Sequence, residues 1–173
     1  MIDRQRGVTL LELMTALAVL AILMGVGVPA FNNIVRNSQI AAQSAGLVQA
    51  LNLARSEALK RGVRVSVCAA AASGNDCGAA AAWNNGWIVF ADDFGAAGVI
   101  DPADLPFIIQ NWPAQASGVQ ITIAQPSVTF TRMGRAEFAR TFTVSKSGCS
   151  GDQRRQIGVA TSGRIGLQHL PCS

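Results

Sequence analysis

One acidic residue, Glu12, lies inside an apolar run of 21 residues, Val8–Val28, that contains no other charged residue. As a helix this run would be about 31 Å long, close to the thickness of the hydrocarbon core of a bilayer. A lone carboxylate in lipid costs on the order of 3 kcal/mol by insertion scales. Cleavage after Gly7 would create a free amine on Val8. The ammonium of a neighbouring subunit could then pair with Glu12 and fix the register between subunits.

The position of Gly7 distinguishes this N-terminus from a secretory signal peptide. In a signal peptide the small residue at the cleavage site follows the apolar region. Here Gly7 precedes the apolar region and follows a short leader that contains Arg4 and Arg6, so cleavage would leave the whole apolar helix on the mature chain. We therefore expect a leader peptide at residues 1–7 and a transmembrane or filament-core helix at residues 8–28.

The four cysteines, Cys68, Cys77, Cys149 and Cys172, all follow the apolar segment. Their spacing fits no zinc-binding pattern, and a single histidine leaves little to hold a metal. An even number of cysteines behind a membrane segment indicates two disulfides in an oxidising compartment. Of the three possible pairings we favour Cys68–Cys77 and Cys149–Cys172, because each pair closes a short loop. Four free buried thiols are the alternative.

The last part of the chain is basic, because residues 127–173 contain seven Lys or Arg residues against two acidic ones. Such a surplus is usually a solvated face, but it could also meet the phosphates of a nucleic acid. Arg154, Arg155 and Arg164 are the candidate contacts. Strand alternation over residues 154–160 would place Arg154 and Arg155 on opposite faces, which weakens a shared binding surface.

The sequence offers no catalytic constellation. The acidic stretch from Asp92 to Asp104 misses the spacing of a calcium-binding loop and lacks its bidentate glutamate, so it is read as a solvated turn. His169 has no candidate nucleophile and base beside it. We therefore predict a protein that is not an enzyme and that needs neither a metal nor a cofactor.

A helical pattern continues after the apolar run. Pro29, with Gly25 and Gly27 before it, would loosen or kink a helix there. Residues 29–62 then read as an amphipathic continuation that stops at Gly62, after two basic residues suited to a helix C-terminus. Its apolar stripe consists of Ile40, Leu47, Val48, Leu51, Ala54, Ala58 and Leu59.

A β-rich head domain is expected at residues 63–173, because the period of the apolar pattern changes to two at Val63. A loop rich in small residues is predicted at 69–82. The predicted strands are 63–68, 86–90, 119–124, 127–131, 140–145, 154–160 and 165–170.

The N-terminal motif resembles a known processing signal. The motif Gly-Val-Thr-Leu-Leu-Glu at residues 7–12, behind a short basic leader, is similar to the class III signal of type IV pilins and type II secretion pseudopilins. The resemblance implies that a prepilin peptidase cuts after Gly7 and methylates Val8, and that Glu12 aids assembly into a filament. Most members of that family have Phe directly after the glycine, whereas this chain has Val8.

Four segments of the remaining chain carry a second resemblance: 53–58, 83–92, 130–135 and Gly163-Arg164. They are similar to the GspH/FimT/FimU group of minor pilins and pseudopilins. The resemblance implies an α+β pilin fold, in which a long N-terminal helix packs on an antiparallel β-sheet domain outside the inner membrane.

Some FimT-like minor pilins bind DNA for natural transformation through a C-terminal Gly-Arg-x-Arg motif. The matching place here reads Gly163-Arg164-Ile165-Gly166, so the second arginine is absent. The sequence therefore favours a structural minor pilin over a DNA receptor.

The interpretation from sequence is a single-pass inner-membrane protein with a periplasmic head, which later joins an extracellular pilus. Its expected partners are other minor and major pilins and the prepilin peptidase. It would help to prime or cap type IV pilus assembly. The alternatives are a DNA-binding minor pilin and a type II secretion pseudopilin, which shares the N-terminal signal.

Overall fold

The computed structural model describes residues 9–101, 107–113 and 118–172, apart from the side chain of Val26. The chain divides into two compact units, Met1–Val35 and Arg36–Ser173. A single helix, α1, runs from Leu10 to Arg61 and keeps its helical assignment at Pro29. The helix therefore continues beyond this proline, as its helical pattern predicts.

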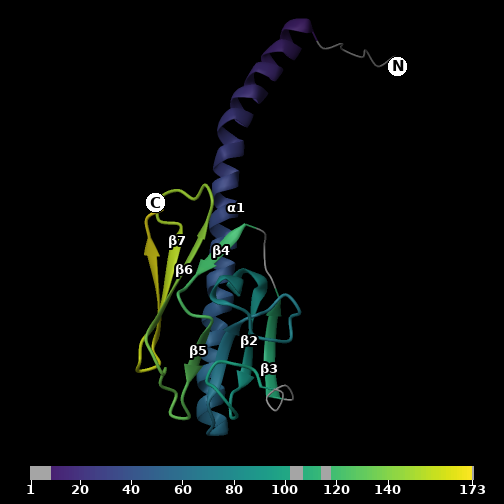
Figure 1. Ribbon diagram of the computed structural model, residues 1–173. Helices are drawn as coiled ribbons and strands as arrows, with labels where there is room; N and C mark the ends of the chain where they lie inside the picture. The colour runs from purple at the N-terminus through teal and green to yellow at the C-terminus, as the bar shows by residue number, and fades with distance from the viewer. Residues whose placement is uncertain (1–8, 102–106, 114–117, 173) are drawn as a thin grey trace, which may run out of the picture. The chain divides into compact units, whose positions relative to one another are not determined.

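The second unit contains two four-stranded antiparallel sheets (Figure 1). The first has the order β3-β2-β1-β5 and the second the order β4-β6-β7-β8. A short 3-10 helix, η1, precedes β2 at Ala80–Asn85. The strands are β1 Val65–Ala69, β2 Gly86–Ala91, β3 Ile108–Pro113, β4 Val119–Thr122, β5 Ser127–Phe130, β6 Arg140–Lys146, β7 Arg154–Val159 and β8 Ile165–Leu170. This arrangement confirms the predicted fold class, a long N-terminal helix with an antiparallel β domain.

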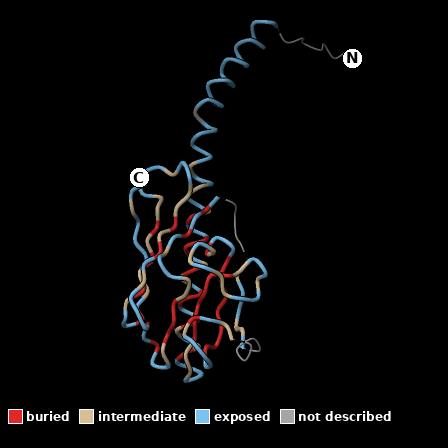
Figure 2. The backbone as a smooth tube through the Cα atoms, in the orientation of Figure 1, coloured by how far each residue is buried: buried red, intermediate tan, exposed pale blue. Residues whose placement is uncertain are grey.

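The two sheets share one core with the part of α1 that belongs to the second unit. Ile40, Leu47, Leu51, Ala54 and Ala58 are fully buried, as the three-to-four spacing predicts. They pack in one cluster with buried side chains of both sheets, and Figure 2 colours the backbone of buried residues red. Leu59, predicted in the same stripe, is instead 55% exposed.

The first sheet is covered on both faces, which corrects the alternating pattern expected for its first strand. Every residue of β1 is buried, because a second apolar cluster of Cys68, Ala70, Ile88 and Phe90 lies apart from the main core. Ser66 is buried as well. Its hydroxyl bonds to the Asp92 carboxylate at 2.6 Å and to the Thr129 hydroxyl at 2.7 Å.

Two of the three tryptophans are packing residues. Trp83 and Trp87 are at most 1% exposed. The Trp83 ring meets Phe142 edge-on at 4.9 Å between centroids, and its indole N–H donates to the Gln125 carbonyl. This satisfies the polar atom that a buried tryptophan carries.

One strand was missed from sequence. Among the described residues, β3 pairs only with β2 and forms an edge of the first sheet. Its residues Ile108–Pro113 are half-buried or exposed, so they show no clear two-residue alternation. The proline at its end is tolerated because an edge strand leaves one row of backbone groups unpaired.

Candidate functional site

The start of α1 is fixed by a capping interaction. The backbone N–H of Glu12 donates to the Thr9 hydroxyl oxygen at 3.2 Å. Thr9, Leu10, Leu11 and Glu12 form a Thr-x-x-Glu pattern, which is the signature of a capping box. Sequence reasoning assigned Glu12 to assembly and missed Thr9, although this spacing could have revealed the cap. Gly7 and Val8 lie outside the described residues.

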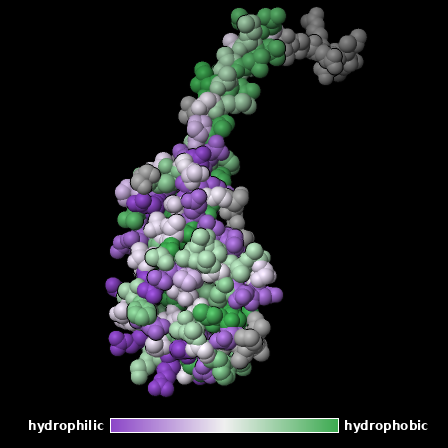
Figure 3. Space-filling view, in the orientation of Figure 1, coloured by the Kyte–Doolittle hydropathy of each residue, from purple (hydrophilic) through white to green (hydrophobic). Residues whose placement is uncertain are grey.

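The first unit, taken by itself, exposes a large apolar surface. Leu10, Leu11, Met14, Ile22 and Leu23 are each more than 60% exposed, and Figure 3 shows this part of α1 covered with apolar residues. α1 is the one helix among the described residues that is long and apolar enough to cross a membrane. Such a surface requires lipid or other apolar helices as its surroundings.

The β6–β7 loop is fastened to α1 by polar contacts within the second unit. Arg36 donates to the Gly148 carbonyl at 2.6 Å, and the Lys146 ammonium donates to the Gln39 carboxamide oxygen at 2.6 Å. Arg155 donates to the Asn37 side-chain oxygen at 2.9 Å. These contacts hold the loop against the helix.

Arg155 is buried, so the structure removes it from the candidate DNA contacts. Only 6% of the residue is exposed. Besides its bond to Asn37, its guanidinium donates to the backbone carbonyls of Asp152 at 2.7 Å and Gln153 at 2.8 Å. It points to the core side of β7 because strand alternation sends it opposite to its neighbour Arg154.

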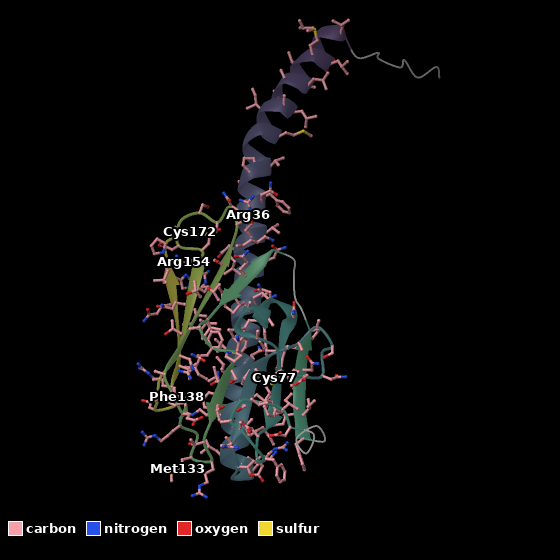
Figure 4. The ribbon with its side chains drawn as sticks, viewed as in Figure 1. Arg36, Cys77, Met133, Phe138, Arg154 and Cys172 are labelled. Carbon is pink, nitrogen blue, oxygen red and sulfur yellow. A yellow bond between two sulfur atoms is a disulfide. The ribbon has the colours of Figure 1, made fainter. Side chains whose placement is uncertain are left out.

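The other two candidate arginines lie at opposite ends of the β7–β8 hairpin. Arg154 pairs in register with Leu170, whereas Arg164 lies in the turn beyond the Val159–Ile165 pair. Five residue steps separate Arg154 from Val159, which corresponds to about 17 Å along a strand. Figure 4 shows Arg154 close to Cys172 and far from Phe138 along the sheet. The three arginines therefore do not form one cluster.

Both disulfides join the short-loop pairs that the sequence favours, Cys68 with Cys77 and Cys149 with Cys172. The first links the end of β1 to the loop before η1, and the second links the β6–β7 loop to the residues that follow β8. No free cysteine remains.

Comparison with known proteins supplies the family. The family model "Type II transport protein GspH" matches residues 43–163, which is more than half of the chain. The chain belongs to the GspH family. The "Prokaryotic N-terminal methylation motif" matches residues 2–28 of this GspH-family protein. No curated protein sequence matches it.

The fold of this GspH-family chain is similar to that of a solved pilin. Two crystal forms of the type IV minor pilin FimU of Pseudomonas aeruginosa strain PAO1 match it with TM-scores of 0.56 and 0.50. Each is 22% identical in sequence and covers 76% of this chain, with 89% and 90% of the FimU chain covered. The identity is too low to carry more than the fold. The two family matches, together with this shared fold, identify the chain as a minor pilin or pseudopilin.

Three segments that carry the GspH-family resemblance meet in one place. Arg55 of α1 donates to the Gly134 carbonyl at 3.0 Å. Gly163 sits over the same carbonyl with φ of +79°, and a Cβ there would overlap that oxygen and approach the Arg55 Nε. The Gly134 carbonyl thus links α1, the turn before β6 and the β7–β8 turn. The backbone of the β7–β8 turn approaches this carbonyl so closely that only glycine fits at residue 163.

The acidic stretch expected to be a turn is partly structural. Asp92 is fully buried. Its carboxylate accepts bonds from Ser66, the Gly98 backbone N–H and Arg64. Among the described residues, no three His, Cys, Asp or Glu side chains lie close enough to hold a metal ion. Asp104 lies outside the described residues.

Proposed function

We propose that this chain is a structural minor pilin that helps to prime or cap a type IV pilus. A prepilin peptidase cuts it after Gly7, and residues 8–28 anchor it in the inner membrane with its head in the periplasm. Residues 29–62 continue the helix into the head formed by residues 63–173. The observation that carries the proposal is the methylation motif over residues 2–28, which includes the exposed apolar start of α1 and its one carboxylate, Glu12.

The role proposed for Glu12 is electrostatic. Apolar side chains surround it along the first unit, and between Leu10 and Val35 there is no other charged residue. Inside a bundle of such helices, a carboxylate is stabilised by a cation that approaches it, and the methylated amine of Val8 on the next subunit is such a cation. The pair would set the axial stagger between subunits.

Two variants test this proposal in cells. Gly7→Val should block cleavage, because a bulky side chain obstructs the approach of the peptidase to the backbone. Glu12→Ala should leave cleavage intact but reduce incorporation into pili. Intact mass of the protein extracted from the membrane measures cleavage, and its abundance in sheared pili measures incorporation.

The capping pattern supplies a sharper control for Glu12. Gln at this position can still serve in a capping box, but it has no charge. If the ion pair matters, Glu12→Gln should impair incorporation as strongly as Glu12→Ala. Normal incorporation of Glu12→Gln together with loss in Glu12→Ala would assign the residue to helix capping instead. A wild-type chain that still begins at Met1 would refute the whole proposal.

A type II secretion pseudopilin is the second candidate, because the matching family is described as a type II transport protein. Both machines use the same N-terminal signal, so the two candidates differ in their partners. Deletion of the gene should abolish surface pili if the chain primes a pilus. Loss of an exported enzyme from the medium, with pili intact, would identify a pseudopilin.

A further inference from the structure

The outer face of the second sheet carries mainly polar side chains. In register across β6, β7 and β8, one row consists of Thr141, Gly158 and Gly166. The next row consists of Thr143, Gln156 and Gln168, and Thr122 of β4 extends that row. The intervening residues, among them Phe142, Ile157 and Val159, are buried on the core side. Hydroxyl and carboxamide groups therefore point away from the core over most of this face.

A hollow of about 260 Å³ lies in this face, next to the β7–β8 turn. Its floor includes Gly158 and Gly166, which are directly paired, and a Cβ built on either glycine would meet no atom within 4 Å. Glycine in the interior of a strand is unfavourable and often marks a place where a ligand approaches the backbone closely. The two opposed glycines create the hollow.

Two arginines line this hollow, together with neutral hydrogen-bonding side chains. Arg164 is exposed and Arg140 is half-buried. Arg140 pairs in register with the buried Val159, and its guanidinium lies over the ring of Phe138, which does not line the hollow. Arg164 is therefore the cation available to a ligand there. No described residue that lines the hollow carries a carboxylate, and its remaining polar side chains are Thr141, Gln156 and Gln168.

This combination fits an anionic chain that is rich in hydroxyl groups and sparse in charge. Guanidinium groups bind carboxylates through paired, charge-assisted hydrogen bonds. Threonine hydroxyls and glutamine carboxamides both donate and accept, as sugar hydroxyls do. We propose that this face binds an acidic polysaccharide, with a carboxylated sugar in the hollow held by Arg164.

Nucleic acid fits the same face less well. Duplex DNA carries one charge per about 1.7 Å of its axis, and its binding depends on many phosphate contacts. Arg164 is the one cation that the described residues offer to a ligand in the hollow, and Arg155 is turned into the core. Single strands bind by stacking bases on aromatic side chains, whereas none of the described residues lining the hollow is aromatic.

The test is binding of fluorescently labelled polyuronate oligomers to the full-length chain in a detergent that has no sugar headgroup. Neutral dextran oligomers of matched length should bind at least about tenfold more weakly, since the lost contacts are charge-assisted hydrogen bonds. Arg164→Gln should weaken polyuronate binding by about tenfold for the same reason. Arg132→Gln removes the same charge from an exposed site outside the hollow and should change binding by less than about twofold.

A second variant tests the hollow itself rather than its charge. Gly166→Val fills space that is open in the fold and suits a strand, so tryptophan fluorescence should show an unchanged thermal transition while polyuronate binding falls by about tenfold. Failure to bind polyuronate up to millimolar concentration would overturn the proposal, as would equal effects of Arg132→Gln and Arg164→Gln. Tighter binding to DNA of matched length that survives Gly166→Val would assign the face to nucleic acid instead.

Discussion

Replacing Arg155 with Met should destabilise the head strongly without changing any exposed surface. Met keeps much of the side-chain length but removes the guanidinium. Three hydrogen bonds shorter than 3.0 Å are lost, to Asn37 and to the carbonyls of Asp152 and Gln153. The bond to Asn37 joins β7 to the helix, so its loss loosens the contact between α1 and the second sheet.

The magnitude follows from these bonds and from the burial of the charge. A hydrogen bond to a charged group contributes about 1.5–3 kcal/mol. Removing the buried cation also removes the cost of desolvating it, which offsets part of the loss. We therefore expect the free energy of unfolding to fall by about 3 kcal/mol, which corresponds to a Tm lower by about 10 °C for a unit of this size.

Tryptophan fluorescence is the assay, because all three tryptophans, Trp83, Trp87 and Trp112, belong to the second unit. The full-length chain in detergent can therefore be used, and the signal reports only the head. Arg132→Met, at an exposed position, is the matched control and should leave Tm within about 2 °C. An Arg155→Met protein with the wild-type Tm would refute the view that this arginine is a structural anchor.

Three further predictions concern the rest of the head. Gly163→Ala should lower the free energy of unfolding by at least about 2 kcal/mol, because the new Cβ would overlap the Gly134 carbonyl oxygen. Gly151 also has a positive φ, but the space beside it is open, so Gly151→Ala should cost less. Urea titration measures both changes. The Arg61 guanidinium hydrogen-bonded to Glu57 lowers the pKa of that carboxyl. At a pH above the usual carboxyl pKa, Glu57 therefore stabilises α1 by no more than about 0.5 kcal/mol. This contribution is lost as the pH falls through the lowered pKa. Glu57→Gln and wild type should thus differ near pH 7 and converge as the pH falls, and a difference in urea titrations that does not change with pH would contradict this assignment. Changing Cys149 and Cys172 together to Ser should cost about 3 kcal/mol in the chain-entropy model, and non-reducing peptide mapping of the wild type checks the pairing.

The elements that sequence predicted well are those whose pattern is local. The buried stripe of α1 follows from spacing along a single helix, and β8 was predicted at Ile165–Leu170, the bounds that the structure gives. Gly163 falls between two predicted strands, 154–160 and 165–170, so a turn is expected there. Its close approach to Gly134 and Arg55 could not be predicted, because these residues are far apart in sequence.

What could not be predicted depends on which face of a strand is covered. β1 alternates in sequence, yet Ser66 is buried because Asp92 and Thr129 satisfy its hydroxyl. Alternation showed that Arg154 and Arg155 diverge but could not say which of them meets the helix. The glycine-floored hollow was missed for the same reason, since Gly158 and Gly166 become neighbours only through the pairing of β7 with β8.

The Cys149–Cys172 disulfide makes a closed covalent ring of the chain from the β6–β7 loop to the end of β8. β8 is an edge strand held by hydrogen bonds to β7 alone, so a chain pulled from its C-terminus would otherwise peel residue by residue. With the ring closed, tension applied beyond Cys172 passes directly to Cys149 and bypasses the β7–β8 ladder. A single protease cut between Cys149 and Cys172 would also release no fragment, because the disulfide still joins the two pieces covalently.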